Sequence, residues 1–395
     1  MVNTNICLTI MVAALHFGLW GLCARAHGSS EEDFSVIERE RLIPKKDKFY
    51  YYDSQPVGAQ AFYTPWNFIM EGGYGALYGW RLDTFDFSSG AKVVGRSLLD
   101  PITTVEHYGY GRFFWHEFIP HFGEGMSWTP NWNWHLIGGG FRTRLLKEYY
   151  LHQGSEYPTA NAWASTYLMH YFNEIIQAAK YPKEYGTVDA IADLVFFDFF
   201  GKLLFEIDAV NEFFAKTLHL REWSFQTRWD PQTKRLDNHG QLYWVRYEVY
   251  DPLSIGILTG EQASTVNITW RVDHKHQWTF GIGTKPKDIL LTAGGVAKPS
   301  SIVFDFGFFY SVNDNPLVVF TYEPADTPVY HTVLWDSVIR LNFYPGTLGL
   351  DSLEESASLA LTWDQGTFYA HCVVGWSMIG VDVNEAAVHG DFAHF

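Results

Sequence analysis

The stretch SIVFDFGFFYSV, from Ser301 to Val312, decides the fold class of this chain. Its large apolar side chains recur at every second position, and one face carries Ile302, Phe304, Phe306, Phe308, Tyr310 and Val312. Asp305, Gly307 and Ser311 fall on the other face. Because successive side chains of a β-strand point to opposite faces of a sheet, this period of two predicts a strand with one apolar and one mixed face.

The same alternation recurs from about Leu242 onward. STVNITWRV places Val266, Ile268 and Trp270 on one face, and LYWVRYEVY, DSVIRLNF and ASLALTW follow similar patterns. Turn-rich pieces such as VNDNP, EPADTP and YPGTLG separate these runs. The pattern predicts a series of antiparallel strands joined by short turns.

Two architectures fit such strands. A soluble sandwich would bury the apolar face, whereas a membrane barrel would turn that face to lipid and keep the polar face in its lumen. Aromatic residues make up 18% of the chain and crowd the apolar faces, which favours the barrel. We therefore predict a mainly β fold, an antiparallel transmembrane β-barrel of roughly 10 to 14 strands, from strands of about 10 residues.

The middle of the chain has a different pattern. Residues 159–180 and 187–218 form two long segments without internal proline, and the second is apolar almost all round. Pro158 before Thr159, and Thr187 with Asp189, are typical of helix starts. We expect a helical hairpin inserted at about residues 155–220, packed in or beside the barrel lumen, because a helix that is apolar all round must be covered.

The amino-terminal residues indicate export. An apolar run from Ile6 to Leu22 is followed by the small-x-small sequence Ala24, Arg25, Ala26, which predicts a signal peptide over residues 1–26. Residues 27–60 are then expected to be a charged leader or linker, and residues 61–395 the barrel domain. The predicted location is the bacterial outer membrane. The expected partners are outer-membrane lipid, the barrel-assembly machinery and a small polar ligand in the lumen.

Charge and cysteine content narrow the class further. The chain has 44 acidic and 28 basic residues, so it lacks the basic footprint of a nucleic-acid-binding protein. Cleavage of the signal would remove Cys7 and Cys23 and leave Cys372 alone, so we expect no internal disulfide. We also expect no cofactor.

The segment NWNWHLIGGGFRTR, from Asn131 to Arg144, contains one candidate for chemistry, His135. Its three glycines, Gly138 to Gly140, lack the downstream Gly-Lys-Ser/Thr of a phosphate-binding loop. They are interpreted as positions where the backbone approaches a neighbour closely or where a strand bends. His135 is interpreted first as a structural histidine.

The first predicted helix carries a polar stripe of Thr166, His170, Asn173, Glu174 and Gln177. Since residues four apart share a helix face, Glu174 is expected to lie beside His170 and raise its basicity. The simpler interpretation is a solvated or hydrogen-bonded face. His135, His170 and Glu174 are therefore the catalytic candidates, while Asp189 and Asp193 are explained by the helix dipole.

Weak metal candidates are His116, His121 and Glu124 in the sequence HEFIPHFGEG. The two histidines are five residues apart with Pro120 between them, so they cannot share a helix face as in the zinc motif with histidines four apart. Interfacial histidines among aromatic residues are the simpler account, and we otherwise expect no metal.

The segment order resembles an uncharacterised family of Gram-negative outer-membrane proteins, a domain of unknown function with a predicted β-barrel and helices. The matching positions are Asn131 or Asn133, His135, Gly138, Tyr171, Glu174, Asp189 or Asp193, Gly201 and Glu206. The Asn-to-His spacing is longer than in that pattern when Asn131 is used. The resemblance implies an outer-membrane location and a barrel fold, and no reaction.

These observations favour an exported outer-membrane β-barrel protein with a structural, transport or envelope-maintenance role. We prefer a non-enzymatic role and leave activity open. One alternative is a barrel lipid-modifying hydrolase that uses a histidine with a serine or glutamate. Another is a soluble periplasmic β-rich binding protein. The chain ends on Phe395, as barrels often end on an aromatic residue, but the alternate positions Ala393 and Asp391 do not fit a closing strand at residues 383–395.

Overall fold

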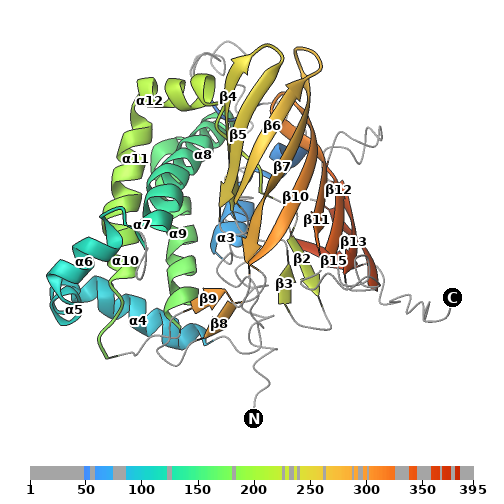
Figure 1. The fold of residues 1–395 in the computed structure, drawn as a ribbon. Helices are drawn as coiled ribbons and strands as arrows, with labels where there is room; N and C mark the ends of the chain where they lie inside the picture. The colour runs from blue at the N-terminus through green and yellow to red at the C-terminus, as the bar shows by residue number, and fades with distance from the viewer. Residues whose placement is uncertain are drawn as a thin grey trace, which may run out of the picture. The chain divides into compact units, whose positions relative to one another are not determined.

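Helices precede strands along the chain in the computed structural model (Figure 1). The structure describes residues 49–53, 58–73, 86–121, 127–179, 184–224, 227–230, 235–237, 241–260, 264–286, 289–291, 297–299, 302–324, 338–344, 357–364, 367–374 and 379–382. All of them belong to one unit, Lys45–Phe395. The predicted signal, most of the predicted leader and residues 383–395 lie outside the described residues.

The helical part is longer than the insert expected at residues 155–220. It consists of η2 (Gly58–Phe62), α3 (Pro65–Gly73), α4 (Phe87–Leu99), α5 (Pro101–Tyr108), α6 (Tyr110–Glu117), α7 (Trp128–Pro130), η5 (Asn131–Gly139), α8 (Gly140–His152), α9 (Pro158–Ala178), α10 (Asp189–Ile191), η6 (Ala192–Phe197), α11 (Asp198–Glu206), α12 (Asp208–Glu212) and η7 (Phe213–Thr217). Of these, η2 is a 3₁₀-helix, and η5, η6 and η7 are π-helices. Helices were predicted only for residues 159–180 and 187–218, because the period of two used elsewhere identifies strands and gives no signal for helices. The helices outside these two segments were therefore not predicted.

The predicted helical hairpin is present with one difference. Helix α9 begins at Pro158, where the missing backbone N–H costs nothing in a first turn. The second segment is not one helix: α10, η6 and α11 run on from one another, but the chain is extended at Ile207 before α12 begins. Local periodicity does not reveal a single extended residue inside an apolar run.

The strands follow the helices and nearly all pair antiparallel. They are β1 (Arg221–Glu222), β2 (Thr227–Asp230), β3 (Arg235–Asp237), β4 (Leu242–Tyr250), β5 (Leu253–Gly260), β6 (Ser264–Arg271), β7 (His276–Pro286), β8 (Ile289–Leu291), β9 (Ala297–Pro299), β10 (Ile302–Val312), β11 (Asn315–Glu323), β12 (Val338–Phe343), β13 (Ala357–Asp364), β14 (Thr367–Val374) and β15 (Ile379–Asp382). Strands β8 and β9 pair separately, and β2 runs parallel to β15. The antiparallel sheet predicted from the alternation is therefore confirmed.

The predicted closed barrel is not what the described residues form. The main sheet has the order β1-β4-β5-β6-β7-β10-β11-β12-β13-β14-β15-β2-β3, and within the described residues no pairing joins its two ends. The sheet curls into a half-barrel, with helices beside it (Figure 1). The period of two fixes strands and their faces but carries no information on whether the last strand meets the first.

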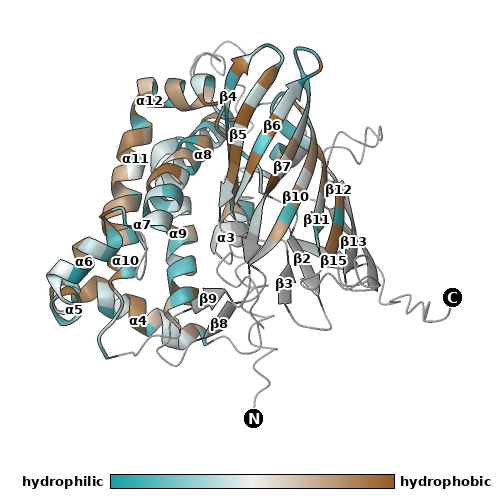
Figure 2. Cartoon of the chain, viewed as in Figure 1, coloured by the Kyte–Doolittle hydropathy of each residue, from teal (hydrophilic) through white to brown (hydrophobic). Residues whose placement is uncertain are grey.

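The faces of the sheet are inverted relative to a soluble protein. Along β6, Val266 is 64% exposed and Ile268 55%, whereas Thr265 and Asn267 between and beside them are buried at 2% and 0%. The same holds in β7 and β10, where Phe280 and Phe308 are exposed and Thr279 is buried. Figure 2 shows brown, hydrophobic positions recurring along these strands. The predicted arrangement of the faces, apolar outward and polar inward, is confirmed for β6 and β7, whereas β10 also buries Phe309 on its inner side.

The buried face of the sheet is held by polar contacts. Arg246 on β4 donates to Asp314 at 2.9 Å and to Ser254 on β5 at 3.1 Å. Gln277 on β7 also donates to Asp314, at 2.6 Å. Since buried polar groups are costly unless they are hydrogen-bonded, these contacts make a polar interior tolerable.

Apolar packing joins the helices to the first strands. Trp223 stacks on Trp244 of β4 with ring centroids 4.2 Å apart, and Phe309 of β10 packs against Trp223. Next to them, Arg142 of α8 forms a fully buried ion pair with Glu222 of β1, at 2.6 Å. The main hydrophobic core therefore lies between α8, α9 and one part of the sheet.

The glycines of the quoted GGG segment serve close helix packing. The expected close backbone approach is confirmed, but the segment is a π-helix running into α8 and not a bent strand. A Cβ atom on Gly140 would collide with the carbonyl oxygen of Gly201 in α11, and a Cβ on Gly201 would collide with that of Leu136. Only glycine at these two positions lets α11 lie against η5 and α8.

Among the described residues, no helix is long and apolar enough to cross a membrane.

We predict that Gly201→Ala lowers the midpoint of thermal unfolding, because the new methyl group would force α11 away from Leu136. Overpacking of this kind typically costs about 1–3 kcal/mol. The matched control is Gly95→Ala in α4, where nothing lies within 4 Å of an added Cβ. That change should be neutral or slightly stabilising, since alanine is the better helix former. Equal shifts for both variants would show that the two backbones are not in tight contact.

Candidate functional site

Four helical elements bring two histidines and three acids together in the protein interior. His135 comes from η5, His170 and Glu174 from α9, Asp193 from η6 and Asp198 from the start of α11. All five side chains are buried, none more than 5% exposed. We call these five residues the histidine–carboxylate cluster.

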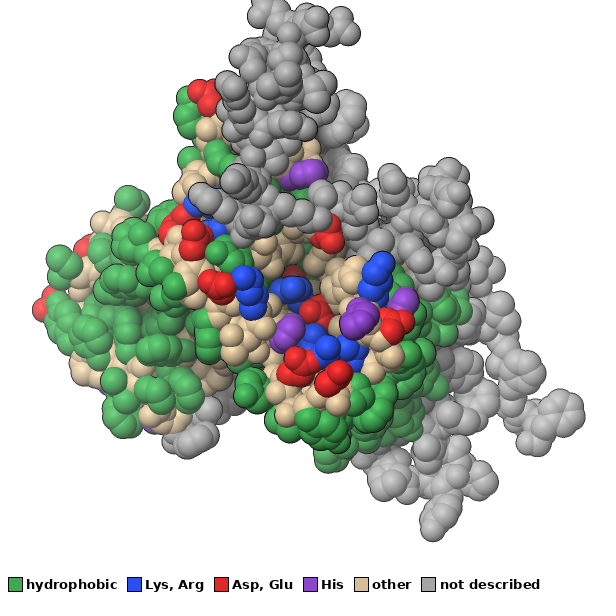
Figure 3. All heavy atoms as spheres, turned by 90° about the horizontal axis from the view of Figure 1, so that it is seen from above, with side chains coloured by type: hydrophobic (Ala, Val, Ile, Leu, Met, Phe, Trp, Pro, Cys, Tyr) green, Lys and Arg blue, Asp and Glu red, His purple; other side chains and the backbone are tan. Residues whose placement is uncertain are grey.

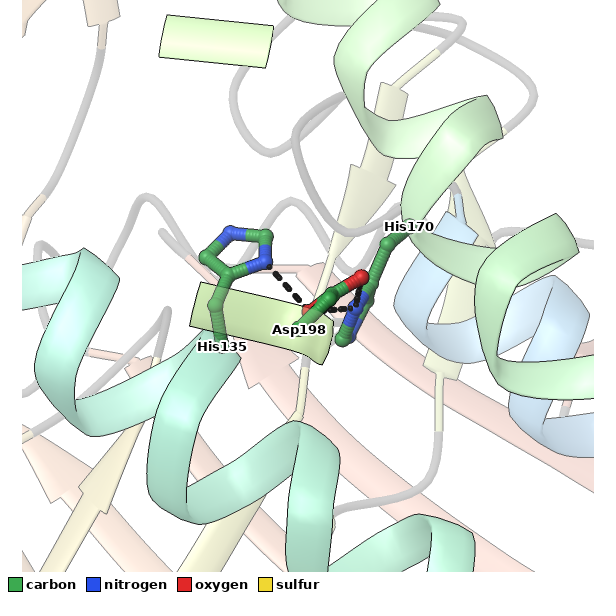
Figure 4. A group of neighbouring side chains, drawn as sticks. All are labelled: His135, His170 and Asp198. Atoms are coloured by element: carbon green, nitrogen blue, oxygen red, sulfur yellow. Dashed lines mark hydrogen bonds and ion pairs between the residues drawn. The ribbon is translucent and has the colours of Figure 1, made fainter. Parts of the chain in front are cut away.

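Asp198 is the centre of one side of the cluster (Figure 4). Its Oδ1 lies 3.1 Å from Nδ1 of His135, and both of its oxygens lie 2.6 Å from Nδ1 of His170. Lys202, one helical turn further on, places Nζ 3.4 Å from Oδ2 of Asp198 and over the ring of Tyr167. The carboxylate thus accepts hydrogen bonds from both imidazoles and faces a buried ammonium.

These contacts set the charge states on the Asp198 side. Burial acts to raise the pKa of Asp198, but His170, Lys202 and the hydrogen bonds from both histidines outweigh it and hold the pKa well below its usual range. Burial lowers the pKa of His170 to about 4, although Asp198 acts in the opposite direction. At neutral pH this side therefore contains an ionised Asp198 and a neutral His170. Burial lowers the pKa of Lys202, although Asp198 acts in the opposite direction.

The opposite side of the cluster is acidic. Nε2 of His135 lies 3.1 Å from Oδ2 of Asp193, and Glu174 belongs to the same group. Burial, followed by repulsion from neighbouring carboxylates, raises the pKa of Glu174 and of Asp193 well above their usual values. No lysine or arginine is among the groups that shift either pKa, in contrast to the Asp198 side.

Two further acids border this side. Burial and the carboxylate of Asp189 raise the pKa of Glu117 to about 8, against a smaller opposing effect of Asn131. Asn131 donates to Oε2 of Glu117 at 2.9 Å and to its backbone carbonyl at 3.1 Å. Asp189 at the start of α10 is half-buried, and burial raises its pKa as well.

Some oxygens on the acidic side lack hydrogen-bond partners. Both side-chain oxygens of Glu174 and Oδ1 of Asp193 are fully buried and receive no hydrogen bond. An unsatisfied buried polar atom costs about 1–3 kcal/mol, and more if it is charged. Such atoms in a native interior require either a bound proton or a bound cation.

Two of the contributing segments are π-helices. His135 lies in η5 and Asp193 in η6, and each π-helix continues into an α-helix. A π-helical stretch inside an α-helix is rare and occurs frequently at functional sites.

The three sequence-predicted catalytic candidates, His135, His170 and Glu174, meet in this cluster. The expected pairing of Glu174 with His170 is not observed; Nδ1 of His170 is hydrogen-bonded to Asp198 instead. The polar stripe of the first helix is not solvated: Thr166, His170, Asn173 and Glu174 are all buried. Asp193 is likewise buried, so the helix dipole is not a sufficient reason for its presence.

Asp198 and Lys202 were not among the site residues predicted from the sequence. They lie in the segment DFFGKLLFE, whose dominant feature is apolar residues. Their spacing of four residues is compatible with an ion pair on one helix face, and it was the available signal. A buried charged pair in an otherwise apolar helix is unusual enough to mark a site.

The weaker metal candidates are placed elsewhere. Nδ1 of His116 is hydrogen-bonded to the hydroxyl of Tyr108 at 2.8 Å, and Nδ1 of His121 to the backbone carbonyl of Ile119 at 2.8 Å. The two rings stack with centroids 6.0 Å apart. Glu124 lies outside the described residues. Among the residues that are described, neither histidine belongs to a group with metal-ligand spacing.

Two groups in the cluster do have that spacing. One consists of His135, His170 and Asp198, and the other of His135, Glu174 and Asp193; in each, one ligand atom per residue lies within 4.8 Å of the others. His135 belongs to both groups because its two ring nitrogens face opposite ways.

Comparisons with known proteins assign no family: no family model, no curated protein and no solved structure matches this chain. The resemblance to an outer-membrane family therefore remains a prediction. Four of the positions that carry it lie close together in space. Asn131, His135, Glu174 and Asp193 all belong to the cluster or its border, and Gly201 makes the close helix contact.

We predict that the stability of the protein falls as the pH rises from 4.5 toward about 8, the window between the ordinary and the folded pKa of Glu117. In this window the folded state holds a proton that the unfolded state has released, so raising the pH favours unfolding. Glu117→Gln should make the pH dependence shallower, whereas Glu212→Gln at an exposed ion pair should not.

The measurement is the unfolding midpoint as a function of pH, in buffer with a chelator so that only protons titrate the acids. Wild type and Glu117→Gln following the same curve would contradict the raised pKa of Glu117.

Proposed function

We propose that this chain is an exported outer-membrane protein whose curled sheet faces lipid, with a structural, transport or envelope-maintenance role. The observation that carries the proposal is the inversion of the sheet faces in β5, β6, β7 and β10. Exposed large side chains on these strands are Ile255, Ile257, Val266, Ile268, Trp270, Trp278, Phe280, Ile282, Phe304 and Phe308. The resemblance to an outer-membrane family supports the same location.

An exposed apolar surface of this extent is unfavourable in water unless another molecule covers it. Monomeric soluble proteins rarely expose contiguous apolar patches larger than a few hundred Å². Here the apolar positions are also regular, since neighbouring strands place Val266 opposite Ile282, Ile268 opposite Phe280 and Trp270 opposite Trp278. A continuous apolar face with polar side chains behind it is the pattern of a lipid-facing β-sheet.

The strand lengths agree with this role. Strands β4 and β11 have 9 residues, and β7 and β10 have 11. A tilted strand of about 9–11 residues spans the hydrocarbon core of a bilayer. These four strands therefore have the length that a membrane requires, whereas β5, β6, β13 and β14 have 8 residues and β12 has 6.

Charged side chains gather at one end of the strands. Figure 3 looks onto the end that carries α12 and the β4–β5 and β6–β7 turns, and charged and histidine side chains occupy its middle with hydrophobic ones around them. Ion pairs there include Arg246–Asp314, Lys216–Glu212 and His276–Asp273. A polar end beyond an apolar band is expected where strands leave a membrane.

We predict that Ile268→Arg on the exposed face of β6 strongly reduces the amount of folded, membrane-bound protein. Arginine on the lipid face near the bilayer centre costs about 2–4 kcal/mol. The control is His274→Arg in the exposed β6–β7 turn, which should leave binding unchanged. The readout is the fraction that remains with sedimented membranes after an alkaline carbonate wash.

The wild-type protein should co-fractionate with outer membranes and migrate differently on an unboiled gel. A fully soluble, non-shifting protein, together with equal behaviour of both variants, would refute the membrane proposal and favour a soluble periplasmic binding protein.

A second candidate function is a lipid-modifying hydrolase, favoured by the meeting of His135, His170 and Glu174 in one buried cluster. Within the described residues both histidines are hydrogen-bonded to Asp198 and neither to a serine, so the version with a glutamate fits better than the one with a serine. Cells that carry His135→Gln or Glu174→Gln should then show the lipid profile of cells that lack the protein. Unchanged lipids in these cells and in the deletion strain would eliminate this function.

A further inference from the structure

We propose that His135 Nε2, Glu174 and Asp193 bind a divalent first-row transition-metal ion, with Asp198 orienting the histidine from behind. The proposal does not depend on the membrane role of the sheet. It replaces the sequence-based expectation of no cofactor, and it places the metal away from His116 and His121.

The geometry of His135 supports a shared ion. Its Nδ1 faces Asp198 at 3.1 Å, and its Nε2 faces Oδ2 of Asp193 at 3.1 Å. If Nδ1–H donates to Asp198, the lone pair of Nε2 points at the Asp193 carboxylate, which is unfavourable unless a proton or a metal ion lies between them. Two ligand atoms that are each about 2.0–2.1 Å from one ion lie roughly 2.9–3.4 Å apart. The observed separation falls in that range.

The oxygens without hydrogen bonds supply the remaining ligands. Glu174 is fully buried, and neither of its carboxylate oxygens accepts a hydrogen bond. Oδ1 of Asp193 is in the same condition. Atoms of Glu174, Asp193 and His135 that can bind a metal lie within 4.8 Å of one another. A cation at their centre would satisfy all three side chains and offset the negative charge.

The other group, His135, His170 and Asp198, is less suitable. Both oxygens of Asp198 already accept hydrogen bonds from imidazole nitrogens, and Lys202 Nζ lies 3.4 Å from one of them. A metal ion there would be repelled by the lysine ammonium. Asp198 instead suits the outer shell, because a metal-bound histidine usually donates its second ring N–H to a carboxylate.

The ligand set indicates the class of metal. One imidazole and two carboxylates suit Zn²⁺, Mn²⁺ or Fe²⁺, whereas Ca²⁺ and Mg²⁺ prefer sites made only of oxygen. Three protein ligands leave at least one coordination position for water or another molecule, as in catalytic rather than structural metal sites.

The experiment measures binding of Zn²⁺ and of Mn²⁺ to the full chain by calorimetric titration after chelation, with Ca²⁺ and Mg²⁺ for comparison. Wild type should bind one transition-metal ion per chain. Glu174→Gln and Asp193→Asn should each weaken binding beyond the roughly 10–100-fold that loss of an outer-shell partner causes. A variant with both His116→Gln and His121→Gln should bind like wild type.

A fold control separates lost ligands from lost structure. Glu174→Gln keeps the size of the side chain and removes an uncompensated buried acid, so the metal-free variant should unfold at the same temperature as metal-free wild type or higher. Added Zn²⁺ should raise the unfolding temperature of wild type and not that of the variant. Absence of binding in wild type, equal binding by Glu174→Gln, or tighter binding of Ca²⁺ or Mg²⁺ than of Zn²⁺ and Mn²⁺ would each overturn the proposal.

Discussion

The close approach of two helix backbones at Gly140 and Gly201 is the constraint on which the candidate site depends. With no Cβ atom at either position, α11 lies against the junction of η5 and α8. This contact places Asp198, at the start of α11, within hydrogen-bonding distance of His135. The same continuous run of helix carries Arg142 to its buried ion pair with Glu222 at the first strand. One helix therefore connects the buried cluster to the sheet.

An imbalance of charge distinguishes the two sides of the cluster. On one side, Asp198 is compensated by Lys202 and by hydrogen bonds from two histidines. On the other, Glu174 and Asp193 are buried near each other, and Glu117 and Asp189 lie beyond them. Removing charges from water costs several kcal/mol per ion unless partners replace the lost hydration. Either protons or a metal ion must supply that compensation. If protons do, the cluster is structural; if a metal ion does, the cluster is a metal site.

The cluster buries charged groups, whereas the sheet exposes apolar side chains and buries polar ones on the strands described above. Contacts such as Thr269 with Thr279, at 2.8 Å, satisfy the inner face strand by strand. The outer face has Trp270, Phe280 and Phe308 exposed, and water is an unfavourable neighbour for them. The proposed contact with lipid would cover these side chains without any rearrangement of the strands. The proposed membrane location and the buried cluster thus arise from different parts of the chain and can be tested separately.

The sequence alone determined the longer strands from β4 onward, their two faces and the extent of α9, because each depends on a short-range period or on a residue such as Pro158 at a helix start. The short strands β1, β2, β3, β8 and β9 were not predicted. It also identified His135, His170 and Glu174 as candidates. Tertiary structure decided which of them meet: His135 and Asp198 are 63 residues apart in the chain and touch only because glycines allow two helices to pack closely. The π-helices, the break at Ile207 and the open order of the sheet were equally inaccessible. Periodicity reports the side on which a residue lies, whereas long-range packing selects the residue that it faces.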